Sequence, residues 1–143
     1  MNEWRNAFAT HEEAQKLATG EWLGDGFPGV ALPSRRALHR WVLLRYGAKF
    51  TCAQIEDVGP WCVDDDNYVF GGEKSRAEIF IGKRCPYRFG DLATMATVPD
   101  GKGGWLPAKK CNGAGIDLFP RTAKELGIPI GENVRVDWRW IEF

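Results

Sequence analysis

Apolar and polar side chains alternate over seven consecutive positions near the end of the chain, from Val134 to Trp140. Because successive side chains of a β-strand point to opposite faces, this pattern predicts a half-buried strand with its valines and tryptophans on one face. Just before it, Pro120 in the first turn and Gly127 at the C-terminal stop predict a short helix from Pro120 to Leu126. The chain is therefore expected to close with a helix followed by a strand.

Two more strands are predicted in the first half, Trp41–Tyr46 and Lys49–Glu56, on either side of a turn at Gly47. Gly and Pro together are frequent, at 17 and 8 of 143 residues, which favours many turns and short strands over a helical bundle. At this length we expect one mainly β domain, spanning residues 21–143. Residues 1–20 are predicted to be a helical extension, with a capping box between Thr10 and Glu13.

The overall charge excludes one class of partner. Lys and Arg together number 19, as do Asp and Glu, so the formal net charge is zero. This balance argues against nonspecific binding to nucleic acid or to an anionic membrane. There is no run of 18 apolar residues, so no membrane span is expected, and the first residues lack the apolar region of a secretory signal. Either the protein stays in the cytoplasm, or the given sequence has been trimmed, or export uses another route such as host lysis.

The four cysteines do not have the spacing of a metal site. There is no CxxC or HxxxH pair, so neither a metal nor any other cofactor is expected. A cysteine nucleophile is also disfavoured, because the papain-type sequence around the thiol is missing. An even count permits two disulfides, and free buried thiols are the alternative. The cysteines are Cys52, Cys62, Cys85 and Cys111.

Two acids stand out by their position. Asp57 ends a predicted strand just before the turn Gly59-Pro60, and Asp117 lies between two apolar residues just before the predicted helix. Either acid could simply cap a helix or bind loop amides. If the two converge in an apolar cleft, their pKa values move apart and provide one acid and one base. Cleavage of glycans is a common use of such a pair.

The sequence around these two acids is similar to that of a known family. Asp57 is followed by Gly59-Pro60-Trp61, and Asp117 lies in Ile116-Asp117-Leu118, ahead of an Ala-containing helix and a Val-rich last strand. From about Val30 to Phe143 the chain thus resembles double-psi β-barrel proteins of the rare lipoprotein A type, related in fold to expansins. The resemblance implies a six-stranded double-psi barrel with a groove lined by both acid-bearing segments.

The resemblance also implies an activity on cell-wall glycans, most of all peptidoglycan, at the cell wall or in the periplasm. Asp57 matches the acid that is essential in peptidoglycan-cleaving members, and Asp117 matches an acid of expansin-like and endoglucanase relatives. Asp57 would be the general acid/base of a lytic transglycosylase or hydrolase, with Asp117 as its partner. The cleaving members carry a His before the Leu-Pro that opens the barrel, whereas Val30-Ala31 precede Leu32-Pro33 here.

Four further residues are predicted to bind the polysaccharide in this groove: Trp61, Asp65, Tyr68 and Asn112. Trp61 and Tyr68 flank an acidic loop and could stack on sugar rings. Cys52 and Cys62 lie on either side of the Asp57 turn and could form a disulfide across it. Cys85 and Cys111 could do the same for the loop between them. Two other functions stay open. One is a non-catalytic carbohydrate-binding or expansin-like module, which the missing His favours, and the other is a structural barrel of a phage or secretion assembly.

Overall fold

Six strands of this chain close into a β-barrel in the order β1-β7-β2-β4-β3-β8. The structure is a computed structural model, and it describes residues 3–11, 19–20, 26, 28–61, 65–82, 97–99, 105–107, 111–129 and 131–142, with only the backbone of 97–99 and 105–107. The barrel strands are β1 (Arg5–His11), β2 (Val30–Leu32), β3 (Trp41–Tyr46), β4 (Lys49–Val58), β7 (Ala114–Leu118) and β8 (Val134–Trp140). The expected mainly β, six-stranded barrel is thereby confirmed.

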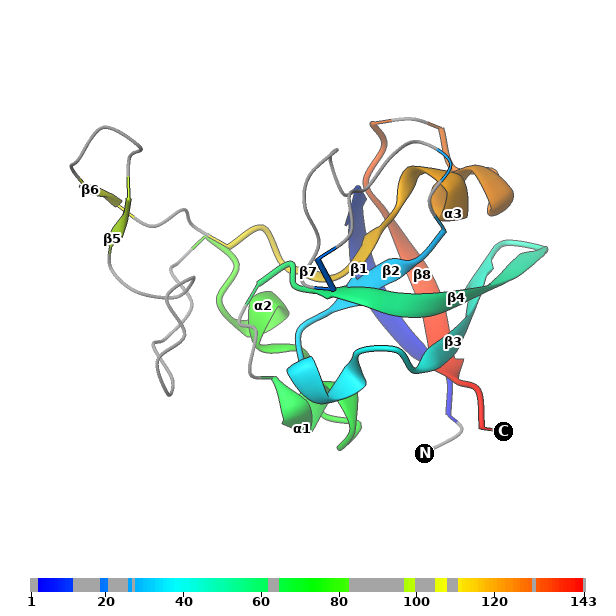
Figure 1. Cartoon of the computed structure of the whole chain (residues 1–143), viewed down its shortest axis with the longest axis horizontal. Coiled ribbons are helices and arrows are strands. Elements are labelled where there is room, and N and C mark those ends of the chain that lie inside the picture. The colour runs from blue at the N-terminus through cyan, green and yellow to red at the C-terminus, as the bar shows by residue number, and fades with distance from the viewer. Residues whose placement is uncertain are drawn as a thin grey trace.

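Four short helices and a small separate sheet complete the described structure (Figure 1). The helices are η1 (Arg35–Ala37), α1 (Asp66–Val69), α2 (Arg76–Ile79) and α3 (Pro120–Glu125). Strands β5 (Thr97–Pro99) and β6 (Trp105–Pro107) pair with each other in an antiparallel sheet away from the barrel. The helix predicted before the last strand is α3, and the predicted strands of the first half are β3 and β4.

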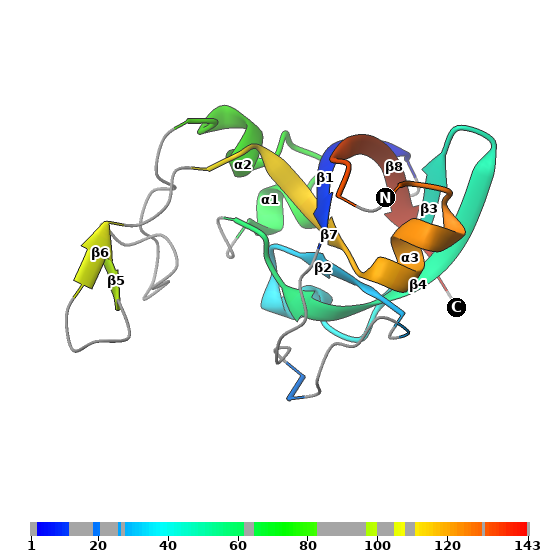
Figure 2. The same cartoon turned by 90° about the horizontal axis from the view of Figure 1, so that it is seen from above.

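The strand pairing is symmetric about the middle of the barrel. β2 and β7 are antiparallel to each other, and each has a parallel partner on its other side, β4 for β2 and β1 for β7. Both parallel pairs contain a shift in register. The remaining pairs, β3 with β4, β3 with β8 and β1 with β8, are antiparallel and close the ring that Figure 2 shows from above.

The core fills the inside of this ring, and the last strand contributes its largest side chains. Val136, Trp138 and Trp140 are buried and Val134 is half-buried, which confirms the predicted face of β8. The indole nitrogens of the two tryptophans both find buried acceptors. Trp138 Nε1 donates to the Tyr68 hydroxyl over 2.9 Å, and Trp140 Nε1 donates to the Val69 carbonyl over 3.1 Å. These two hydrogen bonds hold helix α1 against the tryptophans of β8.

Helix α3 is fastened to the start of β2 by a pair of hydrogen bonds. The Thr122 hydroxyl donates to the carbonyl of Gly29 over 2.7 Å and accepts from its N–H over 3.1 Å. A side chain at Gly29 would not fit, because its Cβ would lie 2.8 Å from the Phe119 ring. The close approach fixes β2 beside the helix that follows Asp117.

The predicted helix over the first 20 residues is wrong for residues 5–11. These form β1, a strand between β7 and β8 that belongs to the barrel itself. Ala7 and Ala9 are buried in the core there, and they pair with Val136 and Val134 of β8. Thr10 lies in this strand and pairs with Asp117 of β7, so it does not cap a helix. Residues 12–18, which hold the rest of the proposed capping box, lie outside the described residues.

The described cysteines, Cys52 and Cys111, are both free thiols. Cys62 and Cys85, their partners in the two suggested disulfides, lie outside the described residues. Cys52 is exposed. Cys111 is buried, and its Sγ donates to the Ala77 carbonyl over 3.2 Å. Burial raises the pKa of the Cys111 thiol, which disfavours the thiolate that a nucleophile needs. Within the described part of the chain, no helix is long and apolar enough to cross a membrane.

Tyr68→Phe tests the buried hydrogen bonds that hold α1 to β8. The change removes one hydroxyl and leaves Trp138 Nε1 and the Gly115 carbonyl without their buried partner. We expect the free energy of unfolding to fall by about 1–3 kcal/mol, as for other unsatisfied buried groups. Urea denaturation monitored by tryptophan fluorescence measures the change. Tyr46→Phe, at a half-buried tyrosine that ends β3, is the control and should shift stability by less than about 0.5 kcal/mol. Equal losses in both variants would contradict this account.

Candidate functional site

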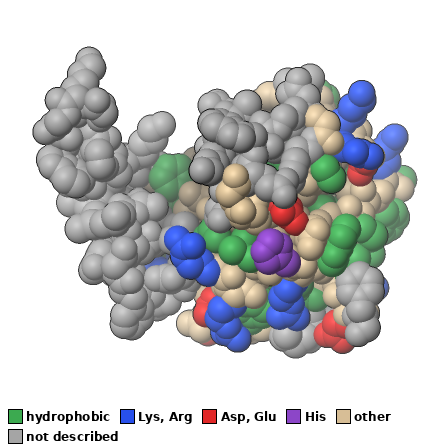
Figure 3. All heavy atoms as spheres, viewed as in Figure 1, with side chains coloured by type: hydrophobic (Ala, Val, Ile, Leu, Met, Phe, Trp, Pro, Cys, Tyr) green, Lys and Arg blue, Asp and Glu red, His purple; other side chains and the backbone are tan. Residues whose placement is uncertain are grey.

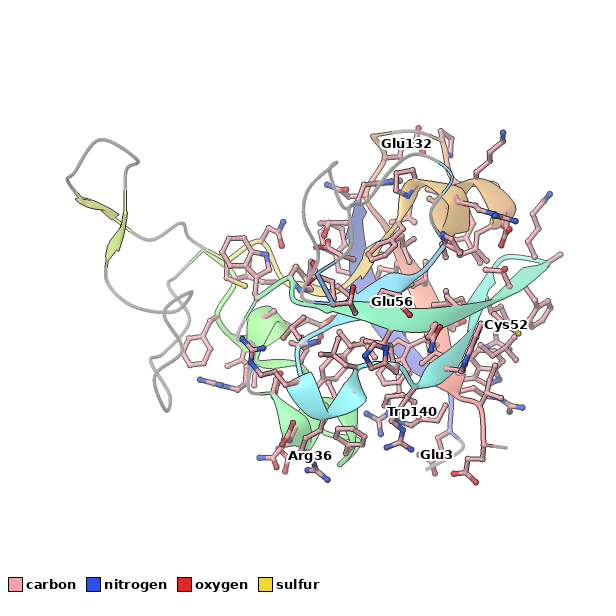
Figure 4. The ribbon with its side chains drawn as sticks, in the orientation of Figure 1. Glu3, Arg36, Cys52, Glu56, Glu132 and Trp140 are labelled. Atoms are coloured by element: carbon pink, nitrogen blue, oxygen red, sulfur yellow. The ribbon has the colours of Figure 1, made fainter. Side chains whose placement is uncertain are left out.

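The two predicted catalytic acids lie at one level of the barrel, on either side of β2. Ala31 in β2 pairs with Asp117 of β7 on one side and with Asp57 of β4 on the other. Two strand spacings therefore separate the acids, which corresponds to about 10 Å between their Cα atoms. The fold thus brings together two acids that are 60 residues apart in the sequence. Figure 4 labels Glu56, which marks this level of β4 on the side facing the viewer.

Shifts in register bring both acids to this level. In β4 the pairing with β2 jumps from Ile55 to Asp57, so that Glu56 is an extra residue. In β7 the pairing with β1 jumps from Ala114 to Ile116, so that Gly115 is an extra residue. An extra residue of this kind bends a strand and re-aims the side chains next to it.

Asp117 has a polar neighbour that orients its carboxylate. Thr10 in β1 pairs directly with Asp117, and the Thr10 hydroxyl donates a hydrogen bond to Oδ1 of Asp117. Because Ile116 and Leu118 on either side belong to the core, Asp117 points out of the barrel. A row of four paired residues thus runs across the strands from β1 to β4 at one level of the barrel. It consists of Thr10, Asp117, Ala31 and Asp57.

Asp57 is the more enclosed of the two acids, with 9% of its surface exposed, whereas Asp117 is half-buried. After Asp57 the chain is held to β2 by a hydrogen bond from the Gly59 N–H to the Leu32 carbonyl, 3.2 Å long. The peptide bond that follows, Gly59-Pro60, is cis. The expected turn after Asp57 is therefore present, and it is anchored to the same strand that pairs with both acids.

Two of the four predicted substrate-binding residues meet near the end of this turn. Trp61 Nε1 donates to Oδ1 of Asn112 over 2.8 Å, and the same oxygen accepts from the Ala114 N–H over 2.9 Å. Trp61 is half-buried and Asn112 is exposed. Trp61 follows the end of β4 and Asn112 precedes the start of β7, so each acid-bearing segment contributes one residue of the pair. Both side chains are at least partly accessible to solvent, and their role in binding a polysaccharide stays a prediction.

The other two, Asp65 and Tyr68, lie in the interior, which corrects their predicted place in a groove. Asp65 is 1% exposed, and its Oδ2 accepts a hydrogen bond of 2.7 Å from the Arg76 N–H at the start of α2. Tyr68 is 3% exposed, and its hydroxyl donates to the Gly115 carbonyl over 3.1 Å. Burial raises the pKa of Tyr68, so it stays protonated as a donor. Neither side chain presents a surface on which a sugar could stack.

Tyr68 instead contributes to the site through a contact with the backbone of β7. Its hydroxyl contacts the extra residue Gly115, where a Cβ would lie 2.9 Å from that oxygen. The contact holds the bulge that sets the register of Asp117 two residues later. Sequence reasoning missed Gly115 and Thr10 as parts of the site. The signal for Gly115 was its place among small residues just before Asp117, whereas Thr10 was assigned to a helix.

The barrel also places a histidine beside β4, although no motif predicts one. His39 is exposed, and its N–H donates to the Ile55 carbonyl of β4 over 2.7 Å. Its own carbonyl accepts from the side chain of Gln54 over 2.9 Å, and its φ of 69° lies in the left-handed region that non-glycine residues rarely adopt. Figure 3 shows a histidine and an acidic side chain next to each other on the face of the molecule that carries β4.

The acidic loop does not assemble a metal site in the described residues. Asp65 is directed to Arg76, and Asp66 accepts from the Ser34 hydroxyl and pairs with Arg36 at 3.3 Å. No group of three or more His, Cys, Asp or Glu residues in the described part of the chain could hold a metal ion. Asp64, the first of the three consecutive acids of this loop, lies outside the described residues.

Comparison with models of known protein families found no match, and comparison with curated proteins found none either.

Asp65→Asn tests whether the buried acid of the loop stabilises the fold rather than binding a ligand. The substitution weakens a charge-assisted bond to the Arg76 N–H, so we expect the free energy of unfolding to fall by about 1.5–3 kcal/mol. Asp66→Asn is the matched control, because Asp66 is half-exposed and its ion pair with Arg36 is worth at most about 1 kcal/mol. Chemical denaturation compares the two. A smaller loss for Asp65→Asn than for Asp66→Asn would refute the structural role.

Proposed function

We propose that this protein is a double-psi β-barrel that cleaves glycosidic bonds in a cell-wall polysaccharide, most of all peptidoglycan. The observation that carries the proposal is the pairing of one residue, Ala31, with both Asp57 and Asp117. The two acids therefore lie at one level of the barrel. The symmetric pairs of parallel strands around β2 and β7 support the double-psi assignment.

The two acids have different surroundings, which supports different roles. Asp57 is enclosed and becomes the general acid/base, whereas Asp117 is oriented as an acceptor by the Thr10 hydroxyl and stabilises charge or positions the nucleophile. In the first step a proton from Asp57 passes to the glycosidic oxygen while its bond to the anomeric carbon breaks. The attacking group is a water molecule or a hydroxyl of the same sugar, and it gives its proton to a carboxylate.

The spacing of the acids favours attack by water or by the sugar's own hydroxyl over attack by a carboxylate. Enzymes that form a covalent glycosyl intermediate hold their carboxyl groups about 5–5.5 Å apart, and those that place water between them about 6.5–9.5 Å apart. The Cα atoms of Asp57 and Asp117 lie two strand spacings apart, about 10 Å, which leaves room for a water molecule or a sugar hydroxyl between their side chains. His39, exposed beside β4, is a candidate second proton-transfer group.

The pair formed by Trp61 and Asn112 extends the site along the barrel. Asn112 precedes Asp117 by five residues and Trp61 follows Asp57 by four, so the pair lies at most about 13–17 Å from the row of acids. A separation within this limit is spanned by a short run of sugar units. A glycan bound to Trp61 and Asn112 would thus reach the acids with one of its glycosidic bonds.

The second candidate is a non-catalytic carbohydrate-binding module. It is favoured by the small exposed fraction of Asp57, 9%, which restricts the approach of a polysaccharide to its carboxylate. The accessible pair of Trp61 and Asn112 would serve this function equally well. Binding to insoluble wall without release of soluble fragments separates this candidate from the enzyme.

Asp57→Asn should abolish release of soluble fragments from purified peptidoglycan while leaving binding to the wall intact. Loss of a general acid/base lowers the rate by about 100-fold or more. Fragments are quantified by mass spectrometry, and binding is measured by pelleting with insoluble wall. Asp137→Asn is the control, because Asp137 is an outward acid of β8 that pairs with Arg45 and lies outside the row. Thermal unfolding of each variant verifies its fold. Undiminished release by a folded Asp57→Asn protein would exclude the catalytic assignment.

A further inference from the structure

A second candidate site lies at the opposite end of β1 from the row of acids. A pocket of about 360 Å³ opens between the first residues of β1 and the segment from Phe70 to Glu78. This volume falls within the range of small-molecule sites, about 300–1,000 Å³. Arg5 lies five residues before Thr10 on β1, which corresponds to about 17 Å. Figure 4 shows Glu3, another lining residue, beside the N-terminus and well away from Glu56.

Arg5 gives this pocket an anion-binding group. Its guanidinium is half-buried over the Trp138 ring, 5.0 Å from the ring centre, and Nη1 donates to the Tyr68 carbonyl. The Glu3 carboxylate is a further charged neighbour that acts against the lowering of the pKa of Arg5 by burial, but none of the described carboxylates lies within ion-pair distance of it. A guanidinium has five N–H donors in a fork that matches a carboxylate. The remaining donors are therefore available to a ligand.

The loop opposite Arg5 leaves room for such a ligand. Gly72 has a φ of +77°, and a Cβ built there would approach Arg5 Nη2 to 3.9 Å. The loop backbone at Gly72 therefore passes beside the guanidinium without crowding it. Burial lowers the pKa of Arg5, but a guanidinium remains charged at any physiological pH. A half-buried cation that lines a cavity gains more from an incoming anion than an exposed one does.

The other charged residues of the pocket favour a ligand that carries a positive group in addition to its carboxylate. Three carboxylates line it, Glu3, Glu73 and Glu78, against the two cations Arg5 and Lys74. Glu78 is already paired with Arg135 at 2.5 Å, whereas Glu73 is exposed and makes no ion pair with a described residue. A dianion such as phosphate would meet these carboxylates unfavourably. A molecule with both a carboxylate and an ammonium group complements both signs.

We infer that this pocket binds a small zwitterion, an amino acid or a short peptide, with its carboxylate on Arg5 and its ammonium group toward Glu73. Trp4 and Phe70 contribute apolar surface to the lining, which suits an aliphatic side chain. The site shares no residue with the row of acids. The inference therefore does not rest on the proposed glycan-cleaving function, and failure of one leaves the other unaffected.

Titration of the full chain with alanyl-alanine, followed by NMR of backbone amides, tests the inference. We expect saturable shifts confined to residues 3–7 and 70–78. Free alanine in a parallel titration distinguishes a site for single amino acids from one for peptides, and saturation by either supports the zwitterion. The C-terminal amide and the N-acetyl derivative of the dipeptide should each bind at least tenfold more weakly. No shifts at millimolar dipeptide, equal binding of the amide, or equal binding of inorganic phosphate would overturn the inference.

Variants identify the two ends of the ligand. Arg5→Gln should weaken binding of alanyl-alanine at least tenfold, whereas Arg121→Gln, at an exposed arginine paired with Glu125, should leave it unchanged. Because Arg5 also packs on Trp138, Glu73→Gln provides a second test at an exposed position. It should weaken the dipeptide severalfold but leave the N-acetyl derivative unaffected. Glu132→Gln, at the other end of the molecule, is its control (Figure 4). Full affinity in both Arg5→Gln and Glu73→Gln would refute the assignment.

Discussion

The barrel and its candidate site both depend on the pairing of β2 with β4 and β7. This strand has only three residues, and all of them are fully buried. Val30 and Leu32 point into the core, where burial of each is worth about 1.5–3 kcal/mol. Ala31 faces the other way and pairs with both acids. A slip of one residue would turn the two large side chains outward, so packing of the core fixes the register on which the site depends.

Buried hydrogen bonds hold the strands that carry Asp117 and Ala31 in this register. The Tyr68 hydroxyl connects Trp138 of the last strand to Gly115, the extra residue of β7. The Thr122 hydroxyl connects α3 to Gly29, just before β2. These buried bonds begin in the core and end within two residues of Asp117 or Ala31. Stability and placement of the acids are thus coupled through a few hydroxyl groups.

The sequence allows prediction of elements whose pattern is local. Alternation identified β8, apolar runs identified β3 and β4, and Pro120 with Gly127 identified α3. β1 was missed because its inward residues are the small Ala7 and Ala9, which do not mark a strand, while Thr10 resembles a helix cap. The level of Asp57 depends on an extra residue in β4, and no local pattern specifies such a shift. Burial of Asp65 and Tyr68 likewise depends on partners distant in the sequence, Arg76 and Trp138.

The central claim is that the row of acids acts on a glycan, and digestion of purified peptidoglycan sacculi tests it most directly. Sacculi with and without stem peptides are incubated with the folded protein, and the soluble products are analysed by mass spectrometry. The account predicts glycan fragments from both, with anhydro-sugar ends if the sugar's own hydroxyl attacks and reducing ends if water does. No soluble fragments from folded protein that binds the sacculi would contradict the claim, and Asp57 and Asp117 would then serve binding and structure alone.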